Sequence, residues 1–126
     1  MNFQGQGRPV SDEGMDQVCG TLGVSEPEVW AVLTVETRGF GFLQDRRPQI
    51  LFERHIFHKL TNGRYDSGNT DISNAKAGGY VGGPGEYTRL EKALELDQES
   101  ALQSTSWGIG QVMGFNYEVA GFASID

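Results

Sequence analysis

The sequence has little of what builds a disulfide framework or a membrane span. Cys19 is the single cysteine among 126 residues, so an internal disulfide is excluded. No stretch approaches the roughly 18 consecutive apolar residues that span a bilayer. Residues 1–14 lack the apolar region and the cleavage pattern of a secretory signal. We therefore expect a protein that is made in the cytoplasm without a signal peptide and acts elsewhere only if it is exported or released.

Basic residues and histidines are also few. The chain has 10 lysines and arginines against 17 acidic residues, for a net charge of −7. This charge argues against a nucleic acid or an anionic membrane as the main partner, and it fits a neutral or polar ligand better. Because no apolar run is long enough to span a bilayer, we also expect no membrane insertion. His55 and His58 have the i, i+3 spacing that can hold a metal, but no third ligand lies at a telling spacing. We expect packing or surface histidines, with no metal and no cofactor.

The chain is rich in glycine, has apolar residues at helical spacing, and is long enough for one domain. Its 18 glycines indicate many loops, and a hydrophobic content of 37% suits a globular domain. Apolar spacing and a capping box at Ser25 and Glu28 predict an α+β fold that is predominantly helical. In the first half of the chain, the predicted elements are helices over 12–22 and from 26, a strand over 50–52 and a helix ending at 60. An irregular stretch over 61–85 follows, and then a helix over 86–97, whose charged side chains are predicted to point outward. The last predicted elements are a short helix over 98–105 and a glycine-rich turn that becomes helical after 106.

The helix after Ser25 is apolar on nearly every side and ends near a carboxylate, Glu36. This pattern predicts a central, buried helix, and burial together with the helix C-terminus would make Glu36 hold its proton to higher pH. Gly39 and Gly41 leave backbone space for a ligand. A protonated carboxylic acid is what general-acid cleavage of a glycosidic bond needs. The alternative is an ion pair with a nearby arginine, namely Arg38, Arg46 or Arg47.

Glu53 is the second candidate, because it follows the predicted strand and a side chain there can reach a cleft. The alternative is pairing with Arg54 or His55, or exposure to solvent. Three loop aspartates are weaker candidates for a second acid, since such residues mostly stabilise turns; they are Asp45, Asp66 and Asp71.

The most distinctive stretch is "SWGIGQVMGFNY", residues 106–117. Gly108 and Gly110 allow a tight turn, and Gln111 offers an amide beside apolar neighbours, so the turn can present polar groups to a sugar. The alternative is a loop–helix junction with Trp107 as its anchor. Another glycine-rich stretch, "GGYVGGPGEY", is no phosphate loop, because no Lys-Ser or Lys-Thr follows it.

Three stretches, "VETRGFGFL", "RPQILFERHIFHKLT" and "STSWGIGQVMGFNY", together resemble the bacteriophage endolysin-type N-acetylmuramidase domain of the lysozyme-like superfamily. "ETRG" followed by "SWGIGQVM" is also distantly similar to goose-type lysozymes and soluble lytic transglycosylases. The resemblance covers residues 11–126, after a flexible lead over residues 1–10. It implies cleavage of the β-1,4 bond between N-acetylmuramic acid and N-acetylglucosamine in peptidoglycan glycan strands of the bacterial cell wall or periplasm.

The resemblance also implies roles for particular residues. Glu36 matches the catalytic acid, Glu53 an assisting carboxylate, and Ser106, Gln111 and Tyr117 groups that line the sugar cleft. A single acid leaves hydrolysis and the lytic transglycosylase route both open. The family's domain continues through further helices, so we expect a domain that is incomplete at its C-terminal end. The alternatives are a non-catalytic peptidoglycan-binding fragment, or an interaction fragment covered by self-association or a partner chain.

Overall fold

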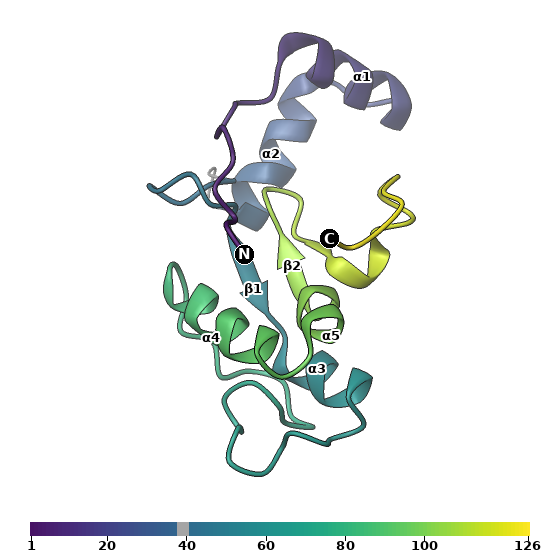
Figure 1. Ribbon diagram of the computed structural model, residues 1–126. Helices are drawn as coiled ribbons and strands as arrows, with labels where there is room; N and C mark the ends of the chain where they lie inside the picture. The colour runs from purple at the N-terminus through teal and green to yellow at the C-terminus, as the bar shows by residue number, and fades with distance from the viewer. Residues whose placement is uncertain (38–40) are drawn as a thin grey trace.

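The computed structural model describes the backbone of residues 1–37 and 41–126 and the side chains of residues 1–35 and 41–126. Figure 1 shows two helices at one end of the molecule and a body built around a small sheet. This arrangement confirms the predicted α+β fold class. In chain order the elements are α1 (Asp12–Leu22), α2 (Glu26–Thr37), β1 (Ile50–Phe52), α3 (Arg54–Leu60), α4 (Gly85–Leu94), α5 (Gln98–Gln103), β2 (Thr105–Trp107), β3 (Val112–Met113) and the 3₁₀ helix η1 (Gly114–Asn116).

α1 and α2 form a helical pair, and of their N-terminal side-chain contacts the sequence predicts the one at Ser25 and Glu28. Ser11 precedes α1, and its Oγ accepts a hydrogen bond from the Gly14 N–H at 3.1 Å. Ser25 precedes α2 and donates its backbone N–H to the Glu28 carboxylate at 2.6 Å, which is the reciprocal half of a capping box. Both predicted helices are therefore confirmed.

The burial predicted for α2 is wrong. Val32 and Val35 are 61% and 79% exposed, whereas a central helix would have both covered. The reason is that α2 packs beside α1 at the end of the molecule, and no described side chain of α2 belongs to the hydrophobic core (Figure 1). Apolar character on every side of a helix does not by itself identify what covers that helix.

The body is organised around an antiparallel sheet in the strand order β1–β2–β3. α4 packs on β1 and on α5, and α5 packs on α3, so these elements enclose one face of the strands. The strand predicted over 50–52 and the helices that follow it are confirmed. The core residues come from all of these elements and from the irregular segment between α3 and α4; they are Ile50, Phe52, Phe57, Ile72, Tyr87, Leu90, Ala93 and Ala101.

The C-terminal stretch differs from its prediction. Instead of a turn followed by a helix, residues 105–113 form the β2–β3 hairpin, and only the short η1 follows. Gln111 and Gly108 have φ values of 47° and 67°, which turn the chain back on itself. Gly114 then closes against α5, where a Cβ would lie 2.0 Å from the Leu102 carbonyl oxygen. This close approach pins the backbone after the hairpin in a turn.

The first residues of the chain also contact the body. The ring of Phe3 lies 5.4 Å from that of Tyr87 and 5.5 Å from that of Trp107, centroid to centroid. Within the described residues, no helix has the length and apolar content needed to cross a bilayer.

Candidate active site

Ser106 and Gln111 meet at the β2–β3 hairpin. The Ser106 hydroxyl donates to Gln111 Oε1 at 2.9 Å, and Gln111 Nε2 donates to the Gly108 carbonyl at 2.9 Å. Ser106 also lies opposite Leu51 in the sheet register. Since side chains alternate along a strand, the side chains of Leu51 and Ser106 lie on the face of the sheet opposite to that of the buried Phe52. The structure therefore brings two of the predicted cleft residues together, on the face of the sheet opposite the core.

Glu53 lies at the end of β1, where the strand gives way to α3. Its backbone N–H donates to the Ser104 carbonyl at 2.9 Å, which ties this corner to the neighbouring strand. The Glu53 side chain is 16% exposed, and its Oε2 accepts a hydrogen bond from the Tyr80 hydroxyl at 2.7 Å. His55 Nδ1 lies 3.2 Å from the same oxygen. The predicted alternative of a pairing with His55 is therefore only part of the arrangement, because Tyr80 is the closer partner.

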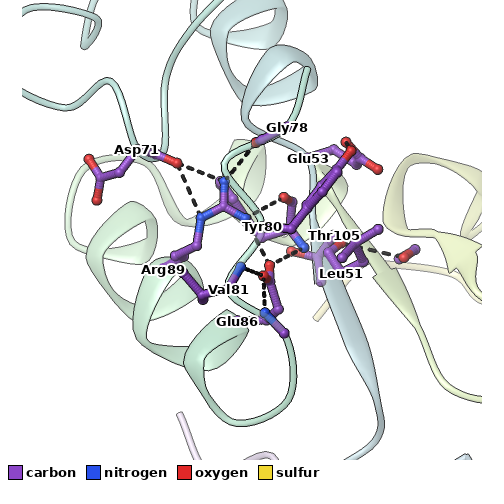
Figure 2. Close-up of polar contacts among 12 residues, drawn as sticks. Leu51, Glu53, Asp71, Gly78, Tyr80, Val81, Glu86, Arg89 and Thr105 are labelled. Atoms are coloured by element: carbon purple, nitrogen blue, oxygen red, sulfur yellow. Dashed lines mark hydrogen bonds and ion pairs between the residues drawn. The ribbon is translucent and has the colours of Figure 1, made fainter. Parts of the chain in front are cut away.

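Tyr80 comes from the irregular segment before α4, and Figure 2 shows its hydroxyl directed at Glu53. Partial burial of the phenol, and then the hydrogen bond and negative charge of Glu53, raise the pKa of Tyr80 above its ordinary value. The phenol therefore stays protonated and able to donate at every pH near neutrality. Its sequence context gave no hint of this contact, since Glu53 lies 27 residues earlier.

Beside Tyr80 lies a buried ion pair between Glu86 and Arg89 of α4 (Figure 2). Glu86 is 0% exposed and lies 2.8 Å from Arg89 Nη1. It also accepts backbone N–H bonds from Phe52 at 3.0 Å, Val81 at 2.7 Å and Gly82 at 3.0 Å. Burial pushes the pKa of Glu86 upward, but the backbone donors and the charge of Arg89 outweigh it, so the net pKa lies below the ordinary value.

The prediction that the charges of this helix point outward is therefore wrong for two residues. Glu86 and Arg89 are both buried. The signal that identifies them was in the sequence: with Leu90 and Ala93 they occupy positions i, i+3, i+4 and i+7 of α4, which is one helix face. A charged pair on the apolar face of a helix indicates a buried ion pair.

Glu36 lies in the last turn of α2, and its side chain is outside the described residues, as is Gly39. The chain that follows α2 returns to the hairpin: a Cβ added at Gly41 would lie 2.9 Å from Ile109 Cβ. The open backbone space predicted at Gly41 is thus filled by Ile109. The same contact brings the chain shortly after Glu36 to the turn that carries Gln111.

Tyr117 lies elsewhere. It lines an apolar cavity of about 440 Å³ together with Phe3, Trp107 and Phe122, and neither Glu53, Ser106 nor Gln111 lines this cavity. The structure therefore places Tyr117 at a cavity that the other predicted cleft residues do not line.

The loop aspartates considered as second acids each have a cationic or imidazole partner. The pairs are Asp45 with Arg47, Asp66 with His58, and Asp71 with Lys92, at 2.7–2.8 Å. Ser73 and then His58 lower the pKa of Asp66. Among the residues that the structure describes, no group of histidine, cysteine and carboxylate side chains is arranged to hold a metal.

Comparison with known proteins identifies the family. The sequence profile of the N-acetylmuramidase family matches residues 25–126, and the chain belongs to this family. Its fold is similar to the crystal structure of the Burkholderia AP3 phage endolysin, with a TM-score of 0.80 and 37% sequence identity. That match covers 94% of this chain and 46% of the endolysin, so the chain spans less than half of the endolysin's length. A comparison with curated protein sequences gives no match. The predicted resemblance to an endolysin-type muramidase domain is confirmed.

Proposed function

We propose that residues 11–126 form a muramidase domain that degrades peptidoglycan. Its substrate is the β-1,4 bond between N-acetylmuramic acid and N-acetylglucosamine in the glycan strands of the cell wall. The observation that carries the proposal is the family match over residues 25–126, which includes the end of α2, the Glu53 corner and the β2–β3 hairpin. The contact between Gly41 and Ile109 supports it, because it links the first of these regions to the third.

In this proposal Glu36 is the general acid. Its proton passes to the glycosidic oxygen as the bond from that oxygen to the anomeric carbon breaks, and an oxocarbenium-like transition state forms. The Glu36 carboxylate then accepts a proton from the attacking water, which gives hydrolysis, or from the muramic acid 6-hydroxyl, which gives a 1,6-anhydro end. Glu53 is the assisting carboxylate that binds the sugar or the water. Ser106 and Gln111 bind the sugar from the hairpin, and we assign Tyr117 to a more distant part of the glycan.

Replacing Glu36 with glutamine tests the assignment. Glu36→Gln keeps the size of the side chain and removes the proton donor, so we expect the release of soluble muropeptides from purified sacculi to fall about 100-fold or more. The matched control is Glu13→Gln on the exposed surface of α1, which should digest sacculi at the wild-type rate. Mass spectrometry of the products identifies the bond and shows whether 1,6-anhydro ends form. Wild-type digestion by Glu36→Gln would remove Glu36 from the mechanism.

A second candidate function is peptidoglycan binding without cleavage, or an interaction surface for a partner chain or a second copy. The exposed apolar residues of α2 favour it, with Trp30, Val32 and Val35 at 40%, 61% and 79% exposed. The mark of a binding fragment is saturable binding to sacculi with no release of soluble muropeptides. The mark of an interaction fragment is a mass that rises with concentration in sedimentation, without affinity for glycan.

A further inference from the structure

The glycine-rich stretch before α4 has no part in the proposed mechanism, yet its conformation is closely specified. The residues on either side of Tyr80 and Val81 are glycines with positive φ, a region in which other residues are strained. They are Gly78, Gly79, Gly82 and Gly83, with φ values of 101°, 76°, 74° and 52°. The chain therefore presents Tyr80 from a segment whose path depends on glycine on both sides.

Arg54 holds the approach to this segment. Its guanidinium donates to the carbonyls of Lys76 at 2.8 Å, Thr70 at 2.9 Å and Ala77 at 3.1 Å. A Cβ at Gly79 would lie 3.0 Å from Arg54 Nη1, so the backbone passes directly over the guanidinium. Arg54 is the residue after Glu53. The same turn of chain that carries the Glu53 carboxylate thus fixes the segment that carries Tyr80.

Glu86 makes a second link between the two residues. Its Oε2 accepts from the N–H of Phe52, the residue before Glu53, and its Oε1 accepts from the N–H of Val81, the residue after Tyr80. Arg89 binds the same carboxylate and donates to the Phe52 carbonyl at 2.9 Å. One buried ion pair therefore fixes the backbone beside Glu53 and beside Tyr80 relative to each other (Figure 2).

We propose that Tyr80 is the positioning residue for Glu53, and that the glycine-rich segment exists to place its hydroxyl on Glu53 Oε2. This inference rests on the proposed function of the domain. The phenol occupies Oε2 at 2.7 Å, and Oε1 has no hydrogen-bond partner among the residues that the structure describes. We assign Oε1 to a sugar hydroxyl or a water. The orientation of a carboxylate with one oxygen held and one free is set by the group that holds it.

A purely structural role explains Tyr80 less well. The side chain is 47% exposed, so it contributes little to the core, and Arg54 and Glu86 already hold the segment in place. Nearly half of the accessible surface of Tyr80 is open to solvent beside a carboxylate, which also suits contact with a sugar ring. A tyrosine needed only to close the segment would be buried and would have no reason to end on an acid.

Tyr80→Phe tests the inference, because it keeps the ring and deletes the hydroxyl. With glycan strands released from sacculi as substrate, we expect kcat to fall about tenfold, the equivalent of one hydrogen bond to a charged group. KM should change less than about twofold, since the ring remains. The matched control is Tyr65→Phe, which deletes a hydroxyl bonded to the Leu96 carbonyl at 2.9 Å. Both variants should lower Tm by about 4 °C or less, and only Tyr80→Phe should lower kcat.

An absorbance titration of the tyrosines gives a readout that needs no activity. The pKa of the Tyr80 phenol, identified by its loss in Tyr80→Phe, should fall in Glu53→Gln, because the negative charge and the hydrogen bond of Glu53 help to raise it. An unchanged phenol pKa in Glu53→Gln overturns the inference, as does wild-type kcat in Tyr80→Phe. If the wild-type chain releases no soluble muropeptides, with either reducing or 1,6-anhydro ends, the proposed function fails, and the titration alone decides whether Tyr80 holds Glu53.

Discussion

The body of the molecule and its α1–α2 pair are stabilised by different kinds of interaction. The body buries aromatic and aliphatic side chains from four elements and the segment between them, and it closes over the Glu86–Arg89 ion pair. In the helical pair, Met15 is the buried residue among the described side chains, and the valines of α2 face solvent. The body is held by tertiary packing, whereas the pair depends on caps, helix propensity and the contact of two helices.

The residues of the proposed active site are distributed over both regions. Glu53, Ser106 and Gln111 lie on the strands and corners of the body, where neighbouring elements fix their backbones. Glu36 lies at the end of α2, the helix with less tertiary support. An isolated helix of this length is marginal in water, so the placement of the acid depends on the Ser25–Glu28 cap, on α1 and on the contact of Gly41 with Ile109. We infer that activity is lost more readily through α2 than through the body.

The largest expected effect comes from breaking the buried ion pair of the body. Glu86→Ala leaves the Arg89 charge buried without a partner and deprives the N–H groups of Phe52, Val81 and Gly82 of their acceptor. We expect a loss of about 3–5 kcal/mol in the free energy of unfolding, measured by urea denaturation. Glu91→Ala, on the exposed side of the same helix, should change stability by less than about 0.5 kcal/mol. Equal losses in the two variants would show that the pair does not hold the body together.

Most of the fold was predictable, because the helices and β1 carry strong local signals. Apolar spacing identified α1 and α4, the capping box identified the start of α2, and the run Ile50–Phe52 identified β1. The β2–β3 hairpin was missed for a physical reason. Its strands are two and three residues long, so no alternating pattern develops, and their pairing depends on a β1 that is more than fifty residues away.

The candidate site was predictable by residue type but only partly by arrangement. Ser106 and Gln111 share one turn, so their contact follows from local chain geometry. Glu53 was singled out by its place after a strand, but its partner Tyr80 comes from an irregular segment, where the sequence shows glycines and no periodicity. Such a segment is positioned by the side chains that bind its backbone, here Arg54 and Glu86, and those contacts join residues distant in the chain.

A pair of apolar truncations sharpens the comparison between the two regions. Leu90→Ala in α4 removes a side chain that is 0% exposed, and we expect it to cost about 2–5 kcal/mol. Val35→Ala in α2 removes methyl groups that already face water, and we expect a change below about 0.5 kcal/mol. Thermal or urea unfolding of both variants measures the contrast. A loss above about 1 kcal/mol in Val35→Ala would show that the α2 face is covered in solution, by a second copy or by chain packed on it, and would remove the distinction between the regions.

The smallest expected effect is a gain, and it tests whether propensity limits the helical pair. Gly20 lies inside α1, and an added Cβ there meets nothing within 4 Å. Gly20→Ala should stabilise α1 by about 0.5–1 kcal/mol. Because α1 and α2 bury few of their described side chains and contribute none of these to the core of the body, we expect the gain to appear as slower amide hydrogen exchange in α1 and α2, with little change in the unfolding of the body. Gly114→Ala is the opposite case, since its Cβ would lie 2.0 Å from the Leu102 carbonyl oxygen, and it should destabilise the body. If Gly20→Ala slowed exchange in the body as much as in α1, the two regions would unfold as one unit, and α2 would hold Glu36 as firmly as β1 holds Glu53.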